Sequence, residues 1–129
     1  MQAKLLALAS ILEIGTGLAV IVDPTLVVAL LLGGDVSGVA IPIARCFGIA
    51  LLALGLACRP GGAGARSASP PFRAMLIYNA LIALFLVYLF AVEHLGGVLL
   101  WPGVALHAVL AMLLGWTRYT ERPIDTAAT

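Results

Sequence analysis

Charged residues are scarce in this chain of 129 residues: Asp, Glu, Lys and Arg together make up 10%, against about 25% in an ordinary soluble domain. With a net charge of only +1, the chain lacks the basic surface that a nucleic-acid-binding protein needs. So few polar residues also exclude a disordered chain. Its two cysteines, Cys46 and Cys58, lie on one predicted helix about 18 Å apart, so they cannot form a disulfide with each other.

Catalytic and metal-binding motifs are missing as well. The sequence has no glycine-rich phosphate loop, no nucleophile elbow and no zinc-protease helix. It has no cluster of His, Cys and carboxylates at metal-ligand spacing, so we expect no metal site. Hydrolase and ATPase activities therefore have no support. The sequence favours a protein that is not an enzyme, although it leaves that question open.

Apolar residues dominate instead, at 63% of the chain, which is more than one small soluble core could bury. A transmembrane helix needs about 20 mostly apolar residues, and four segments meet this requirement. We therefore predict an all-α integral membrane four-helix bundle. One transmembrane domain covers residues 1–117, with spans at about 5–22, 39–58, 74–92 and 98–116, and a cytoplasmic tail covers 118–129.

A short apolar run, residues 25–32, lies between the first two spans. Asp23 is placed as its N-cap, Pro24 as its first helical residue, and Gly33 with Gly34 as its stop. The run is too short to cross a bilayer, so we predict a short extra helix at the membrane surface or against the bundle. The alternative is one long second helix that begins at Pro24 and continues through the two glycines.

The distribution of positive charge predicts the orientation. The basic residues outside the spans lie at the amino terminus, in the connection between the second and third spans, which includes the Gly-, Ser- and Pro-rich loop 59–71, and in the tail: Lys4, Arg59, Arg66, Arg73, Arg118 and Arg122. These three regions share one side of a four-span protein. We therefore expect both termini in the cytoplasm, and the loop 59–71 to be flexible.

A central polar layer is the candidate site. Counted from the cytoplasmic end of each helix, Glu13 lies roughly 13 Å deep, Arg45 about 20 Å and His107 about 16 Å. Charged residues inside a bilayer are costly and usually face the bundle interior and pair. Asn79 and Tyr78 on the third span are weaker candidates for the same layer, with Asn79 as interhelical hydrogen-bonding glue.

Two interpretations of this layer stay open. In the first, Glu13 and Arg45 form a structural ion pair with His107 as a hydrogen-bonding third member. In the second, the same residues bind a small molecule or relay a proton, since His107 has an unperturbed pKa near neutrality. A haem is disfavoured because His94 is expected at the outer surface and His107 at mid-depth.

The chain resembles small bacterial four-helix membrane proteins of the DoxX-like type. The shared features are Glu13 followed by glycines, Pro24 after the first span, the Leu30-Leu31-Leu32-Gly33 turn, and Arg45 with Gly48 in the second span. The resemblance implies a bacterial inner-membrane protein, in some relatives linked to sulfur or quinone redox systems. It transfers no catalytic residue.

Two functions follow from these observations. The first is an accessory or assembly subunit of a larger membrane complex, or a homo-oligomer, with Glu13, Arg45 and His107 as its structural centre. The alternative is small-molecule or quinone binding, or proton-linked transport, through the polar layer.

Overall fold

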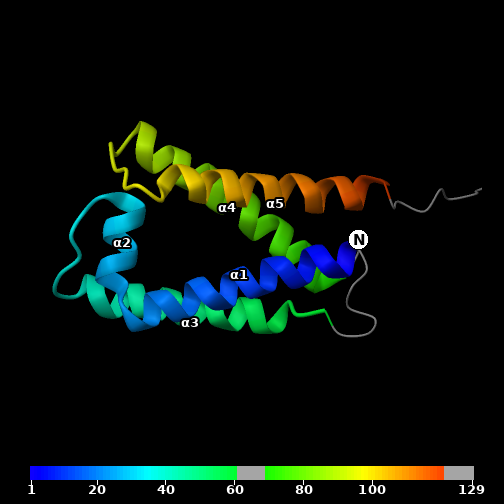
Figure 1. Cartoon of the computed structure of the whole chain (residues 1–129), viewed down its shortest axis with the longest axis horizontal. Coiled ribbons are helices and arrows are strands. Elements are labelled where there is room, and N and C mark those ends of the chain that lie inside the picture. Colours follow the sequence, from blue (N-terminus) through cyan, green and yellow to red (C-terminus); the bar gives the residue numbers. More distant parts are fainter. Residues whose placement is uncertain (61–68, 121–129) are drawn as a thin grey trace, which may run out of the picture.

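The computed structural model describes residues 1–60 and 69–120, which form five helices and no strand. Their order is α1 (Gln2–Val22), α2 (Pro24–Leu32), α3 (Ala40–Ala57), α4 (Pro70–Ala91) and α5 (Leu100–Thr120) (Figure 1). All but α2 are long and apolar enough to cross a membrane. The predicted all-helical class, with a short helix between the first two spans, is confirmed.

The short helix α2 begins and ends as the sequence predicts. The Asp23 side chain accepts hydrogen bonds from the Thr25 hydroxyl (2.7 Å) and the Leu26 amide (3.0 Å). These two bonds, the Thr25 one foremost, hold the pKa of this exposed carboxyl group below its ordinary value. Pro24 occupies the first turn, and Gly33 ends the helix at φ 73°, a conformation that glycine adopts without strain. The alternative of one long second helix is therefore wrong.

Three of the long helices extend beyond the predicted spans, and α1 does so at its start, which lies at Gln2 rather than at residue 5. Helix α4 begins at Pro70, four residues before the predicted span and at the start that the Ser69-Pro70 pair favours, because a proline in the first turn lacks only an amide that would be unbonded anyway. Helix α5 continues past residue 116 to Thr120, where the Thr120 hydroxyl donates to the Trp116 carbonyl. The rest of the tail (121–129) and most of the expected flexible loop (61–68) lie outside the described residues, and so do Arg66 and Arg122.

The long helices form two antiparallel pairs, α1 with α3 and α4 with α5 (Figure 1). Glycines hold the first pair close together. A Cβ atom on Gly17 would lie 2.7 Å from both the Gly48 carbonyl oxygen and the Leu52 amide nitrogen, and one on Gly55 would lie 2.8 Å from the Ser10 carbonyl oxygen. Small residues at a helix interface allow such a close approach of the two backbones.

The two pairs meet at the end of the molecule that holds the N-terminus and diverge toward the other end (Figure 1). The shared core lies at the first end and consists of Leu6, Ala9, Cys58, Phe72, Met75, Leu110 and Leu114. At the other end α2 crosses from one pair to the other. The Leu99 amide donates to the Leu30 carbonyl (2.8 Å) and the Gly97 amide to the Leu31 carbonyl (3.1 Å), so α2 is fastened to the start of α5.

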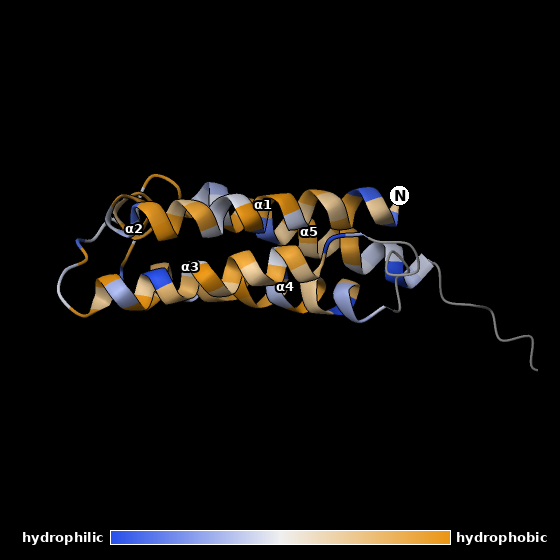
Figure 2. Cartoon of the chain, turned by 90° about the horizontal axis from the view of Figure 1, so that it is seen from below, coloured by the Kyte–Doolittle hydropathy of each residue, from blue (hydrophilic) through white to orange (hydrophobic). Residues whose placement is uncertain are grey.

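The long helices consist mostly of hydrophobic residues (Figure 2), and many of these side chains are exposed on the outer surface. Large side chains such as Ile11, Leu84 and Met112 are each about two-thirds exposed (66%, 69% and 65%). A surface of this kind suits the hydrocarbon of a bilayer. The four candidate spans make the chain compatible with a small multi-pass membrane protein.

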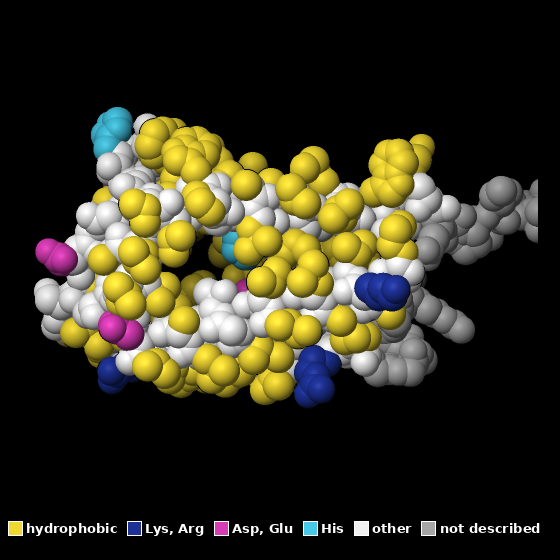
Figure 3. Space-filling view, viewed as in Figure 1, with side chains coloured by type: hydrophobic (Ala, Val, Ile, Leu, Met, Phe, Trp, Pro, Cys, Tyr) yellow, Lys and Arg dark blue, Asp and Glu magenta, His cyan; other side chains and the backbone are white. Residues whose placement is uncertain are grey.

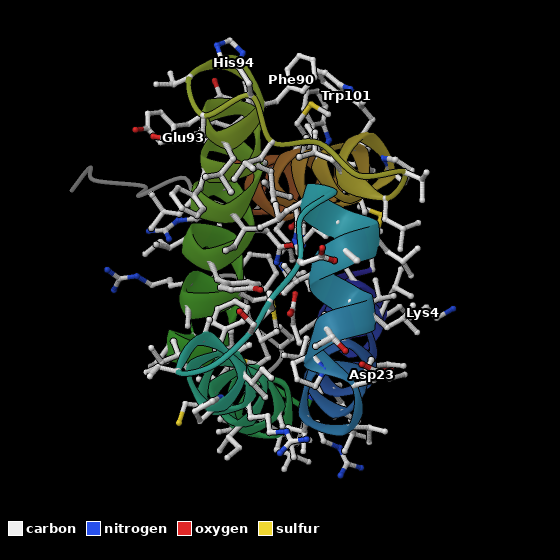
Figure 4. The ribbon with its side chains drawn as sticks, turned by 90° about the vertical axis from the view of Figure 1, so that its left-hand side faces the viewer. Lys4, Asp23, Phe90, Glu93, His94 and Trp101 are labelled. Carbon is white, nitrogen blue, oxygen red and sulfur yellow. The ribbon has the colours of Figure 1, made fainter. Side chains whose placement is uncertain are left out.

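Polar side chains gather at the α2 end of the molecule (Figure 4). Asp23, Glu93 and His94 lie there, and the rings of Phe90 and Trp101 pack edge to face with centroids 5.0 Å apart. His94 is therefore far from the interior of the bundle, as the sequence predicts.

Candidate functional site

Two of the predicted site residues are fully enclosed. Glu13 on α1 is 2% exposed and Asn79 on α4 is 0% exposed. The Tyr78 hydroxyl donates a hydrogen bond to the Glu13 carboxyl group, which links α1 to α4. A carboxyl group in this position needs such a partner, because burying it unpaired would be costly.

His107 joins the same region from α5. Its Nδ1 lies 2.8 Å from the Asn79 side-chain oxygen, and the Asn79 amide nitrogen donates to the Met75 carbonyl at 2.9 Å. The rings of Tyr78 and His107 meet edge to face, with centroids 5.8 Å apart. Three helices thus bring together Glu13, Tyr78, Asn79 and His107, which we call the polar cluster.

Arg45 does not join the polar cluster. It is exposed on α3, it forms no ion pair with Glu13, and the carboxyl group on which its charge acts is that of Asp23. The rotation of α3 separates Arg45 from Glu13. The close contact of α1 with α3 is made by Gly48, and residue 45 is rotated about 60° from that position at 100° per residue.

The ion pair expected from the sequence is therefore corrected. The hydrogen-bonding partner of Glu13 is Tyr78, and that of His107 is Asn79. Both were the weaker candidates in the sequence. A tyrosine or asparagine in an apolar run is a faint signal, because either side chain is also common as a lining or packing residue.

A cavity of about 500 Å³ lies next to the polar cluster. Its walls are apolar side chains from all five helices, among them Val20, Val27, Leu31, Phe47, Phe85 and Leu106. Tyr78 and His107 also line it, together with Thr16. The cavity thus joins an apolar chamber to a few polar groups, which is the usual make-up of a small-molecule site, and its volume is within the usual range of such sites.

The cavity exists because the two helix pairs diverge and α2 covers the space between them. Figure 3, which looks across the helix axes, shows a hollow between the pairs with a histidine side chain at its margin. Pro42 and Pro102, each about one turn outward of the polar residues, favour local bends that open a pocket, and Pro102 lines the chamber. The sequence does not predict that α2 covers the chamber, although an apolar helix too short to span must cover apolar side chains elsewhere in the molecule.

Metal ligation has no support in residues 1–60 and 69–120, where no group of three or more His, Cys, Asp or Glu side chains could hold an ion. A site for a haem iron between the two histidines is also absent from this part of the chain. His94 lies at the α2 end (Figure 4), whereas His107 lines the cavity.

Comparison with known proteins gives no match to a family model, a curated protein or a solved structure. The resemblance to DoxX-like proteins stays a prediction from the sequence motifs.

Proposed function

We propose that this protein binds an apolar small molecule with a hydrogen-bonding polar end, which it takes up from the bilayer. The observation that carries the proposal is the junction of the cavity with the polar cluster. His107 and Tyr78 line the chamber, and each is held from behind by a buried partner, Asn79 or Glu13. Side chains oriented in this way are pre-organised to receive a ligand, which lowers the entropic cost of binding.

The route into the cavity supports a ligand from the lipid phase. The hollow in Figure 3 opens across the helix axes, and these helices are the candidate membrane spans. An opening in that direction faces hydrocarbon rather than water. An apolar molecule dissolved in the bilayer can therefore reach the chamber without crossing an aqueous phase.

Other expectations from the sequence remain proposals with their own support. A quinone is one molecule of the proposed class, and the DoxX-like resemblance favours it. The same resemblance supports a bacterial inner membrane, and the positions of the basic residues support cytoplasmic termini. Proton-linked transport would use the polar cluster. No contact in the described residues bears on the role of an accessory subunit, which stays a prediction.

Filling the cavity tests the proposal. Gly103 lines the chamber, and a Cβ atom there would make ordinary contacts with Leu31 and Leu86 at 3.4 and 3.5 Å. A leucine at position 103 would therefore project into the space with little disturbance of the backbone. The matched control is Gly15→Leu on α1, where a Cβ atom has nothing within 4 Å.

The measurement is native mass spectrometry of protein extracted directly into nanodiscs. We expect the wild type and Gly15→Leu to carry a bound small molecule and Gly103→Leu to lose it. Leu106→Trp, which narrows the same cavity from the next turn of α5, should also lose it if Gly103→Leu fails to fold. Equal retention by the cavity variants and the control, or a wild type that carries nothing, would contradict the proposal.

A further inference from the structure

The polar atoms that face the cavity differ in whether they can donate or accept a hydrogen bond. Three polar side chains line it: Thr16, Tyr78 and His107. The Tyr78 hydroxyl proton is used in the bond to Glu13, so the Tyr78 oxygen offers only its lone pairs to a ligand. The Thr16 hydroxyl can donate or accept and does not discriminate between ligands.

The hydrogen bonds of Asn79 fix which nitrogen of His107 carries the proton. The Asn79 side chain bonds to the Met75 carbonyl at 2.9 Å through its amide nitrogen, and only the amide nitrogen can donate to a carbonyl. The Asn79 oxygen therefore faces His107 as an acceptor, and Nδ1 of His107 must donate to it across 2.8 Å. In a neutral imidazole one nitrogen donates and the other accepts, so Nε2 carries a lone pair.

Nε2 of His107 has no hydrogen-bond partner among the described residues, and the ring to which it belongs lines the cavity. We infer that the cavity selects ligands whose polar end is a hydrogen-bond donor, a hydroxyl or N–H group that binds Nε2 of His107. The inference rests on the proposed function and specifies its ligand class. Ketones, esters and ethers offer only acceptors to these atoms. At Nε2 of His107, a quinone would be bound only in its reduced, hydroxyl-bearing form.

Two probes of nearly equal size test this inference. 4-Octylphenol carries a hydroxyl donor, and 4-octylanisole carries a methyl ether in its place. Each is titrated into wild-type protein in nanodiscs, and the bound fraction is measured by native mass spectrometry. One hydrogen bond predicts that the phenol binds roughly two- to tenfold more tightly than the anisole. The ¹⁵N spectrum of the His107 ring should show an unprotonated Nε2 whose signal shifts with the phenol only.

Variants separate this inference from the proposed function. His107→Phe should reduce the preference for the phenol while both probes still bind. The double variant His107→Phe with Asn79→Leu should do the same, and it leaves no buried amide unpaired if the single variant fails to fold. Gly103→Leu should exclude both probes.

The outcomes differ in what they overturn. Equal binding of the two probes to the wild type, a preference for the anisole, or a His107 ring with both nitrogens protonated contradicts the donor selection and leaves the proposed function standing. Failure of both probes to bind, or binding that Gly103→Leu does not reduce, contradicts the proposed function itself.

Discussion

The contact of α1 with α3 at Gly17 leaves no room for a methyl group, so Gly17→Ala should weaken the bundle. The added Cβ atom would lie 2.7 Å from two backbone atoms of α3, the Gly48 carbonyl oxygen and the Leu52 amide nitrogen. Ordinary contact begins at 3.4 Å, which leaves a shortfall of 3.4 − 2.7 = 0.7 Å. Backbone atoms cannot rotate away, so the two helices must separate.

The magnitude follows from two opposing effects. Forcing an extra carbon into a well-packed contact costs about 1–3 kcal/mol, whereas replacing glycine by alanine inside a helix gains about 1 kcal/mol. Gly15→Ala provides the gain without the clash, because a Cβ atom on Gly15 has nothing within 4 Å. The difference between the two alanine variants therefore isolates the clash, and we expect Gly17→Ala to be less stable by about 1–3 kcal/mol.

The assay is equilibrium unfolding in mixed micelles, with the SDS fraction increased stepwise and helix content followed by circular dichroism. Gly17→Ala should unfold at a lower SDS fraction than Gly15→Ala. If the two variants unfold at the same SDS fraction, the close approach of α1 to α3 at Gly17 does not stabilise this helix pair, and the proposed role of the glycines is refuted.

Three further changes test separate parts of the account. Arg45→Gln should leave the thermal midpoint unchanged, since Arg45 forms no ion pair with Glu13. A large loss of stability would indicate instead that the two side chains do form an ion pair. Asp23→Ala should lower the thermal midpoint at pH 7. Because folding lowers the pKa of Asp23, the ionised carboxyl group should stabilise the fold above about pH 4, and this stabilisation should be lost as the pH falls through the folded-state pKa. An equal effect of the substitution at pH 2 and pH 7 would refute this. Gly97→Ala should displace α2 and speed hydrogen exchange at the Leu99 amide, measured by mass spectrometry; unchanged protection would show that α2 is not fastened there.

The helices and the boundaries of α2 could be predicted from the sequence because their causes are local. Length and apolarity define the spans, and Asp23, Pro24 and Gly33 begin and end α2 within a few residues of chain. The enclosed position of Glu13 and the cavity-facing position of His107 could also be anticipated, since polar groups avoid hydrocarbon.

The partners inside the bundle could not be predicted in the same way. Counting residues along each helix placed Arg45 and Glu13 in one central layer. The rotation of α3 about its axis, however, depends on the contact of Gly48 with α1, which is a tertiary contact. Tyr78 and Asn79 follow each other on α4, yet one bonds to α1 and the other to α5. The cavity depends on the angle at which the two helix pairs diverge, and this angle cannot be derived from the sequence of any single segment.

The most direct test of ligand binding is photo-crosslinking. A 4-alkylphenol that carries a diazirine in its alkyl chain is added to the wild type in nanodiscs, irradiated, and mapped by peptide mass spectrometry. The account predicts adducts on side chains that line the cavity, such as Phe47 and Leu106, and loss of these adducts when unlabelled 4-octylphenol competes. Adducts confined to outward-facing residues such as Ile11 and Leu84, with no competition, would contradict it.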